Sequence, residues 1–390
     1  MRYNLSQVRK KLAIVYPYFA HYREPVFNEI DKKLDLFDVE YIADTKANIP
    51  SLKTINFEEK QHFSKVKNIW FGKFLWQHGL FSLLFSSRPD AIIFLGQFNL
   101  ITTWVNAIIF KSMGTKILFW GHGCYGNESA IKKNVRRLFN RIPNTHLLYG
   151  NYAKKLLIEL GFNQDKLKVI FNSLDYEKQN TVLSSLTDEV KLDVRKSIFN
   201  DNPDRPLLLF IGRLTPIKQL DVLIECLEIL NKKGRFCNCI FIGSGPEEER
   251  LKQMASISGI SSSIKFFGEC HDESILGELI YSADVCVSPG NVGLTAMHSL
   301  AYGTPVVTHD NFKYQMPEFE AITNNVTGSF YTYGSIDSLV ACITTWFDLS
   351  KNEKEHRSKA CMNVISQYYN PEKQAELISM ALDELFLKKV

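Results

Sequence analysis

The sequence contains no long hydrophobic run and only a small excess of positive charge. No stretch approaches the ~18 uninterrupted apolar residues of a membrane-spanning helix, so we expect no such helix. Residues 1–19 are basic, but their apolar run is too short and too interrupted for a signal peptide. A formal net charge of +4, with no basic tail, argues against a dedicated nucleic-acid-binding protein. We therefore expect a cytoplasmic protein that has no nucleic-acid partner.

The sequence also lacks any clear metal-binding or disulfide pattern. Its eight cysteines form no CxxC pair, and no histidine cluster accompanies the close pair Cys237 and Cys239. This pattern predicts reduced, mostly buried thiols, with neither a disulfide framework nor a zinc site. We expect no metal ion and no resident cofactor.

What the chain does contain is a regular alternation of short apolar runs with amphipathic segments. This alternation predicts an α/β fold with parallel sheets, and 390 residues are too many for one ordinary core. The strands expected in the first half are 11–16, 38–42, 90–95, 116–120, 146–150 and 168–171, and those in the second half are 207–211, 236–242, 264–268, 283–288 and 304–308. We expect a first domain over 1–175, a connector over 176–205, a second domain over 206–350 and C-terminal helices over 351–390 that pack back on the first domain.

The stretch from Leu207 to Asp221 organises the second half. Five apolar residues lead into Gly212-Arg213, and a turn with Pro216 precedes Lys218. The order predicts a buried strand, a tight turn and a helix N-terminus. Free backbone N–H groups and two cations five residues apart suit a diphosphate group. For this stretch taken alone, a solvated Arg and Lys at a strand end is the alternative.

Two loops of the first half follow expected strands at the edge where parallel sheets bind ligands. His122 stands between Gly121 and Gly123 directly after one such strand, so a role in the chemistry competes with a structural one. The loop 17–23 follows the first strand. Its last three residues, His21, Tyr22 and Arg23, could contact a substrate; alternatively Tyr22 packs at a helix start and the other two are solvated.

Two segments combine apolar and basic side chains. Residues 130–142 form an amphipathic pattern that predicts contact with an anionic membrane surface, with an ordinary packed surface helix as the alternative. Its apolar members are Ile131, Val135, Leu138, Phe139 and Ile142, and its basic members are Lys132, Lys133, Arg136, Arg137 and Arg141. The aromatic residues 62–85, interspersed with lysines, suit a membrane contact or an acceptor groove, or else the core of a helix.

The second half presents five signals in a fixed order: FIGRLTPIKQLDVLI, FIGSGPEEERL, IKFFG, ADVCVSPGNVGLTAMHSLAYGTPVV and NNVTGSFY. Together with KVIFNSLD and WGHG in the first half, this order resembles the retaining GT-B glycosyltransferases of the "glycosyl transferases group 1" type. That family includes bacterial capsule, O-antigen and exopolysaccharide enzymes. The resemblance implies two Rossmann-like domains facing each other across a cleft, with a C-terminal helix that returns to the first domain.

The resemblance also implies an activity and a set of site residues. The enzyme would move a hexose-type sugar from a UDP or GDP donor to a growing, lipid-linked surface polysaccharide at the inner face of the cell membrane, without a metal ion. Arg213 and Lys218 would hold the diphosphate, and His122 would lie beside the donor sugar. The residues implied at the nucleotide sugar are Gly212, Gly243, Gly245, Phe267, Gly268, Gly290, Asn291, Val292, Gly293, Leu294, Thr295 and His298.

The sequence departs from the family at one pair of positions. The family usually has two glutamates eight positions apart, and Gly290 and His298 stand there in this chain. A neutral His298 could still hydrogen-bond a ribose hydroxyl, and the backbone N–H groups of 291–293 or the Thr295 side chain could hold sugar hydroxyls. Two other functions therefore stay open: a non-catalytic nucleotide-sugar-binding partner with the same fold, and a sugar-nucleotide epimerase.

Overall fold

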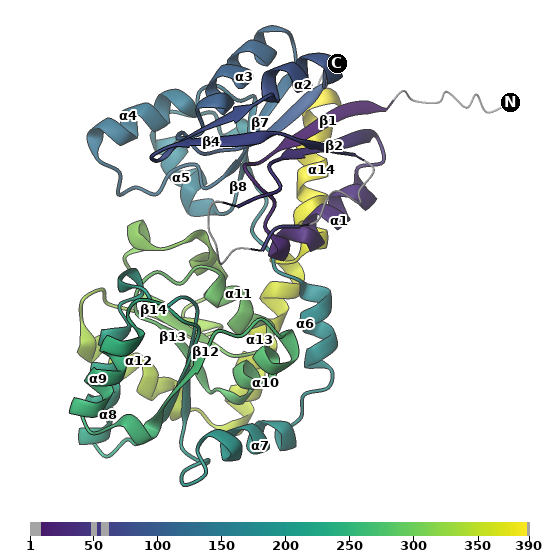
Figure 1. Cartoon of the computed structure of the whole chain (residues 1–390). Helices are drawn as coiled ribbons and strands as arrows, with labels where there is room; N and C mark the ends of the chain where they lie inside the picture. Colours follow the sequence, from purple (N-terminus) through teal and green to yellow (C-terminus); the bar gives the residue numbers. More distant parts are fainter. Residues whose placement is uncertain (1–8, 48–52, 56–61, 388–390) are drawn as a thin grey trace, which may run out of the picture. The chain divides into compact units, whose positions relative to one another are not determined.

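A computed structural model describes residues 9–47, 53–55 and 62–387 of the chain (Figure 1). The chain divides into two compact units. Unit 1 consists of residues 1–174 and 371–390, and unit 2 consists of residues 175–370. Each unit contains its own parallel sheet, as the alternation of apolar and amphipathic segments predicts.

Unit 1 is built on a seven-stranded parallel sheet in the order β3-β2-β1-β6-β7-β8-β9. Its central strands are buried on both faces, which explains their continuous apolar runs. The strands are β1 (Lys10–Val15), β2 (Phe37–Ala43), β3 (Phe63–Lys65), β6 (Ala91–Leu95), β7 (Lys116–Gly121), β8 (Thr145–Leu148) and β9 (Leu167–Val169). The helices are α1 (Glu24–Lys33), α2 (Leu80–Ser87), α3 (Ile101–Ser112), α4 (Ala130–Phe139), α5 (Asn151–Glu159) and α14 (Pro371–Leu387), with the 3-10 turns η1 (His21–Arg23) and η3 (Gln164–Lys166).

The aromatic segment 62–85 is a helical core only at its end, where Leu80 and Leu84 of α2 are buried, so that alternative was wrong for the rest of the segment. It forms β3, an antiparallel hairpin of β4 (Lys67–Phe71) and β5 (Phe74–His78), and then α2. Gly72 occupies a left-handed conformation in the two-residue turn, which favours the hairpin. Phe71 and Phe74 flank that turn and are exposed.

The C-terminal helix α14 is part of unit 1. It packs along α1, where Lys33 and Glu372 form an ion pair of 3.0 Å. Lys168 on β9 reaches Glu384 at 2.6 Å. The expected boundary at residue 351 falls instead at Pro371, because α13 (Lys351–Tyr368) packs on α11 (Leu294–Ala301) within unit 2.

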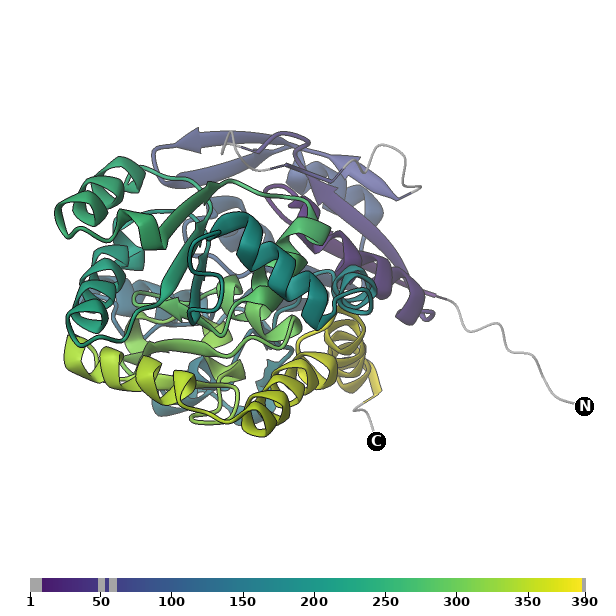
Figure 2. The same ribbon diagram turned by 90° about the horizontal axis from the view of Figure 1, so that it is seen from below.

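Unit 2 contains a six-stranded parallel sheet in the order β12-β11-β10-β13-β14-β15. One group of helices (α8, α9 and α12) lies on one face, and the other helices cover the opposite face (Figures 1 and 2). The strands are β10 (Leu207–Ile211), β11 (Asn238–Ile242), β12 (Ile264–Gly268), β13 (Val285–Ser288), β14 (Val306–His309) and β15 (Gly328–Tyr331). The remaining helices are α6 (Tyr176–Leu183), α7 (Asp188–Ile198), α8 (Leu220–Lys232), α9 (Glu248–Ile257), α10 (Glu273–Ser282) and α12 (Ile336–Phe347), and the 3-10 turns are η4 (Pro216–Lys218), η5 (Ser261–Ser263), η6 (Phe312–Tyr314) and η7 (Pro317–Ala321).

The expected connector is part of unit 2. Residues 176–205 contain α6 and α7, which pack on α10, and Arg195 of α7 forms an ion pair of 2.7 Å with Asp284. The strand order of unit 2 reverses between β10 and β13, and that of unit 1 reverses between β1 and β6. In sheets of this kind ligands bind beyond the carboxyl ends of the strands next to such a reversal. The loops that follow these strands are therefore where a site is expected in each unit.

Candidate active site

The loop after β10 carries both predicted diphosphate-binding cations. Gly212 leaves the strand with a φ of +143° and donates its N–H to the Ile242 carbonyl at 2.9 Å. Arg213 follows and is exposed. Lys218 ends the turn η4, so the helix α8 begins two residues beyond it, at Leu220. The cations thus lie on the loop that follows a buried strand, as the sequence pattern predicts, and the structure shows that this strand borders the reversal point of the sheet.

Lys218 turns toward the start of a different helix, α11. Its Nζ donates a hydrogen bond of 2.7 Å to the Asn291 carbonyl, and it lies beside Gly293, which caps α11. Burial lowers the pKa of Lys218 to about 8, although the charge of Glu318 acts in the opposite direction. The ammonium therefore stands at the positive end of a helix, and both favour a bound anion.

Three glycines let the loops of unit 2 pack backbone against backbone. A Cβ at Gly243 would collide with the Gly212 carbonyl, and one at Gly245 would collide with the Leu214 carbonyl. A Cβ at Gly290 would collide with the Ile217 carbonyl. The N–H of Gly290 donates a hydrogen bond of 2.9 Å to the Lys218 carbonyl. The loops after β10, β11 and β13 are thereby fixed to one another. Gly290 is a glycine because the Lys218 loop occupies the space of a side chain.

His298, which stands at the second position of the missing glutamate pair, lies next to α6. His298 lies on α11, where burial lowers its pKa, so the imidazole is neutral at pH 7. Its Nδ1 lies 3.5 Å from the Nε2 atom of Gln179, which is buried. Sequence reasoning did not find Gln179, because it lies in the segment expected to be a connector.

The start of α11 offers fewer free groups than the sequence suggests. The Val292 N–H donates to Gln315 Oε1 at 2.8 Å, and Thr295 Oγ1 donates to the Ile211 carbonyl at 2.7 Å. Both donors are therefore already engaged within the protein, and only the Thr295 oxygen, which can still accept a hydrogen bond, keeps capacity for a sugar hydroxyl. Asn291 differs, since its Oδ1 is buried and accepts no hydrogen bond from the described residues. Leu294, the first residue of α11, is half-buried.

Two residues near Lys218 were missed by sequence reasoning. Gln315 is buried and also donates to Thr308 Oγ1 at 2.8 Å, so it ties the loop after β13 to β14. Glu318, in the turn η7, is buried and supplies the carboxylate charge that acts on Lys218. Neither belongs to a motif that the sequence revealed.

The end of β12 lies two strands away from the reversal point. Gly268 has a φ of +85°, and its carbonyl accepts the Gly243 N–H at 2.8 Å. Phe267 precedes it and is 37% exposed, so its ring is available to a planar ligand group. These two residues extend the edge formed by the glycine loops.

In unit 1, His122 follows β7 as predicted and stands among aromatic rings. Its ring centroid lies 5.2 Å from that of Tyr125 and 5.0 Å from that of Tyr149. Burial lowers the pKa of His122 to about 4, and the charges of Arg136 and Arg23 act in the same direction. The imidazole is therefore neutral at pH 7, and its Nδ1 has no hydrogen-bond partner among the described residues.

The three residues at the end of the β1 loop differ in their placement. His21 Nδ1 lies 3.3 Å from the Lys53 carbonyl, and Tyr22 is exposed. Arg23 turns inward, and its Nη1 donates a hydrogen bond of 2.6 Å to the Tyr149 hydroxyl. Tyr149 thus joins Arg23 to His122.

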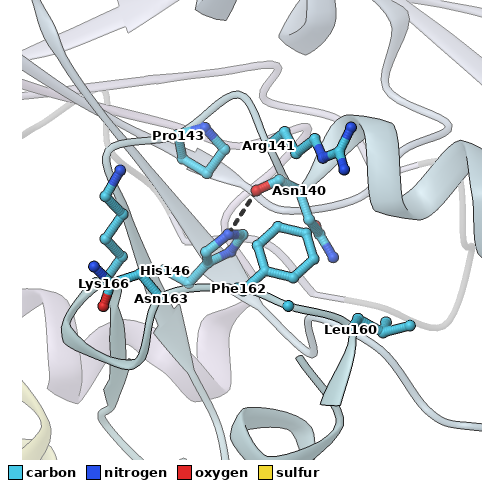
Figure 3. Close-up of a pocket in the computed structure, with 9 residues that line it drawn as sticks. Asn140, Arg141, Pro143, His146, Leu160, Phe162, Asn163 and Lys166 are labelled. Atoms are coloured by element: carbon cyan, nitrogen blue, oxygen red, sulfur yellow. Dashed lines mark hydrogen bonds between the residues drawn. The ribbon is translucent and has the colours of Figure 1, made fainter. Parts of the chain in front are cut away.

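A separate cavity of about 170 Å³ lies near the amino ends of β8 and β9 (Figure 3). His146 lines it and is held by a contact of 2.9 Å between its Nε2 and the Asn140 carbonyl. Burial lowers the pKa of His146 to about 4. No predicted catalytic or nucleotide-binding residue lies in this cavity.

Helix α4 leaves much of its apolar side uncovered. Ile131 is 78% exposed, Leu138 is 59% exposed and Val135 is 39% exposed, whereas Phe139 is buried. Of the basic residues, Arg136 turns inward: its Nη1 donates to the Gly123 carbonyl at 3.0 Å, and its Nε forms an ion pair of 3.2 Å with Glu128. No helix in the described ranges is long and apolar enough to cross a membrane.

Comparison with known proteins shows that the chain is similar to glycosyltransferases. Residues 193–361 match the family model of glycosyl transferases group 1. The chain is 32% identical over 148 residues to an uncharacterized glycosyltransferase of Methanocaldococcus jannaschii, which covers 37% of this chain and 36% of that protein. It is 37% identical over 108 residues to a GDP-mannose-dependent alpha-(1-6)-phosphatidylinositol dimannoside mannosyltransferase of Mycobacterium tuberculosis, over 27% of each chain. The matches thus span about a third or less of these relatives.

The fold matches over nearly the whole chain. The crystal structure of Anabaena HepE in complex with UDP superposes with a TM-score of 0.71 and 17% identity, over 96% of this chain and 100% of that chain. The two-unit, parallel-sheet architecture is that of the GT-B glycosyltransferase structures, as the resemblance implied.

Proposed function

We propose that this chain is a retaining glycosyltransferase that uses a nucleoside diphosphate sugar of the UDP or GDP type. The observation that carries the proposal is the position of Lys218. Its ammonium lies at the start of α11, beside the strand reversal of unit 2, and Arg213 stands on the same loop. The group 1 match includes this whole region, and HepE, a protein of the same fold, was solved with UDP.

The proposed step is the transfer of the sugar to an acceptor hydroxyl. The bond between the anomeric carbon and the diphosphate oxygen breaks, and a bond forms from that carbon to the acceptor oxygen. The acceptor proton passes to the departing diphosphate. Negative charge builds on that diphosphate, and we assign its stabilisation to Lys218, Arg213 and the first turn of α11. With these groups in place, the step requires no metal ion.

His122 is assigned to the donor sugar on the strength of the family resemblance. Its neutral imidazole can donate one hydrogen bond and accept another, which suits a sugar hydroxyl. Its Nδ1, which has no hydrogen-bond partner among the described residues, supports this role.

For the acceptor we propose a growing, lipid-linked surface glycan, such as a capsule or O-antigen precursor, met at the inner face of a bacterial membrane. The exposed stripe of Ile131, Val135 and Leu138 on α4 supports this proposal. Lys132, Lys133, Arg137 and Arg141 are exposed on the same segment. Apolar side chains that enter the headgroup layer, next to cations that attract anionic lipid, are typical of helices that lie on a membrane.

Vesicle flotation tests the membrane contact. We expect the protein to float with anionic vesicles more than with neutral ones, and the double variant Ile131→Gln/Leu138→Gln to lose this binding. Ile257→Gln is the matched control, since Ile257 is 87% exposed on unit 2. Equal absence from both kinds of vesicle would refute the contact.

Nucleotide binding and product analysis test the activity. Thermal melting with UDP, GDP, ADP, CMP and their common sugar conjugates should show a selective shift. A ligand at 100 times its dissociation constant stabilises by ~2.7 kcal/mol. Arg213→Ala and Lys218→Ala should reduce the shift, whereas Arg235→Ala, which removes an exposed ion pair with Asp348, should not. The donor that binds is then incubated with candidate acceptors. A new glycoside supports the proposal, an epimerised donor indicates an epimerase, and binding without either product indicates a non-catalytic partner.

A further inference from the structure

The side chain of Arg23 lies in a box of aromatic rings at the carboxyl end of the unit 1 sheet. The guanidinium carbon is 4.7 Å from the Trp120 ring centroid and 5.6 Å from those of Tyr16 and Tyr149. Tyr16 follows β1, Trp120 is the last residue but one of β7 and Tyr149 follows β8, so residues at the ends of three strands surround one cation. Rings at these distances favour a cation above their faces.

This cation has no anionic partner among the residues that the structure describes. Within the described ranges, no carboxylate lies within 4.0 Å of Arg23, and only its Nη1 donates a hydrogen bond, to the Tyr149 hydroxyl. Its Nε and Nη2 are buried and have no hydrogen-bond partner in the part of the chain that the structure describes. Buried charges in proteins are normally paired, because an unpaired one loses its hydration without compensation.

The neighbours of Arg23 are also unsatisfied. The buried, unpaired side-chain atoms include Tyr16 Oη, Trp120 Nε1 and His122 Nδ1. With the two Arg23 nitrogens, this cluster accounts for five of the ten such atoms among the described residues. The indole N–H and guanidinium N–H groups can only donate, and the tyrosine hydroxyl and neutral imidazole can also donate. An excess of donors around one positive charge is the complement of an oxyanion.

We propose that Tyr16, Arg23 and Trp120 of this cluster bind an oxyanion carried by the acceptor, either a carboxylate or a phosphate, whereas His122 beside them serves the donor sugar. The role of the acceptor rests on the proposed function. The planar guanidinium presents Nε and Nη2 as a fork that fits two oxygens of one carboxylate or phosphate. The diphosphate of the donor is assigned to Lys218 and Arg213 of unit 2, so the anion of unit 1 belongs to the other substrate.

The experiment measures binding of sodium phosphate, sodium glucuronate and glucose by thermal melting and titration calorimetry at constant ionic strength. Full-length protein carrying Arg213→Ala/Lys218→Ala is used beside the wild type, because phosphate could also occupy the unit 2 site. We expect phosphate or glucuronate, but not glucose, to raise the melting temperature of both proteins. The better of the two anions identifies the source of the charge.

When Arg23→Gln is added to either of these two proteins, anion binding should weaken about tenfold or more, since a charged hydrogen-bonding partner is lost. Arg23→Lys keeps the charge without the fork and should recover part of the binding. Arg88→Gln is the matched control: Arg88 is exposed in unit 1, 5.8 Å from the Phe85 ring. It should bind anions like the wild type.

Two results would overturn the proposal: no anion-specific shift in any protein, or an equal shift with and without Arg23. Loss of UDP or GDP binding in Arg23→Gln would assign the cluster to the donor and overturn the acceptor role. Failure of the proposed function would give a different result: no nucleotide would bind, but the anions would still raise the melting temperature in a way that depends on Arg23.

Discussion

The two sheet edges that face ligands differ in how their polar groups are satisfied. In unit 2, Lys218, Val292 and Thr295 all donate to protein oxygens, and glycines lock the loops together. In unit 1, Arg23 and His122 keep buried nitrogens without partners among the described residues. At the first edge Asn291 Oδ1 is the exception, since it is buried without a partner among the described residues, whereas at the second edge five such atoms lie together around Arg23. The unit 2 edge is therefore shaped mainly by close backbone packing. The unit 1 edge is shaped by side chains whose polar atoms are free to bind a ligand.

The largest expected effect comes from the charge at the unit 2 edge. Lys218→Ala should lower turnover by about 100- to 1000-fold, which is the usual result of removing one group that stabilises transition-state charge. Single-turnover transfer from the identified donor measures it. Lys233→Ala, an exposed lysine just after α8, is the control and should leave turnover unchanged. Wild-type turnover in Lys218→Ala would remove this residue from the chemistry.

A methyl group at Gly290 tests whether the unit 2 edge is fixed by its backbone. Gly290→Ala should lower the free energy of unfolding by about 3 kcal/mol, since the new Cβ meets rigid backbone at Ile217 and cannot be relieved by a rotamer change. Urea unfolding measures it. Gly234→Ala has open space around its Cβ and a φ of +73°, so it should cost about 1–2 kcal/mol from backbone strain alone. Equal costs would show that the loops can separate.

The pH dependence separates the two edges further. Because the pKa of Lys218 is lowered to about 8, its ammonium is lost as pH rises through 8. Donor affinity should weaken about tenfold between pH 7 and pH 9. His122 remains neutral across this range, since its pKa is lowered to about 4, so it does not contribute. Calorimetric titration of the donor at several pH values measures the effect.

The same shift has the opposite sign for stability. From pH 8 to about 10.5 the unfolded chain keeps the Lys218 proton that the folded chain has released, so the free energy of unfolding should rise with pH. Comparison with Lys218→Met isolates this contribution, because the variant lacks it. A donor affinity that is constant over pH 7–9 would contradict the lowered pKa.

The smallest effects come from a matched pair of hydroxyl deletions. Thr295→Val breaks a buried hydrogen bond to Ile211 and should cost about 1 kcal/mol. Tyr16→Phe removes a hydroxyl that meets no hydrogen-bond criterion with any described residue, so the free energy of unfolding should change by less than about 0.5 kcal/mol or increase. Urea unfolding of both variants compares them. A larger loss for Tyr16→Phe would show that the unit 1 edge is already satisfied.

The part of the site that sequence could predict is the part that the backbone builds. The run from Leu207 to Lys218 predicts a strand followed by a turn with two cations. The structure places this turn where the strand order of the sheet reverses. Gly243 and Gly245 were also found, because a glycine-rich turn after a strand is a local signal. His122 was found for the same reason, between two glycines at a strand end.

What the sequence did not reveal depends on contacts between distant residues. Nothing local distinguishes Arg23 from His21 and Tyr22, and only the three strands around it turn its side chain inward. From the sequence, Gly290 suggested only the loss of a glutamate. The structure shows that the Lys218 loop fills the space that a side chain at this position would need. The hairpin 67–78 was missed because its short aromatic strands lack clear alternation, and the boundary at Pro371 was missed although proline is common in the first turn of a helix.

The final helix has a consequence for how the chain is made. Ala375, Ile378 and Leu382 of α14 belong to the same buried cluster as Leu12 and Phe27, which lie near the beginning of the chain. On the ribosome, unit 2 has its whole sequence once Asn370 has been synthesised, whereas unit 1 still lacks one wall of its core. Unit 1 is thus synthesised first but completes its hydrophobic core after unit 2. A stop codon near residue 370 would leave the second sheet intact and the first with an open hydrophobic face.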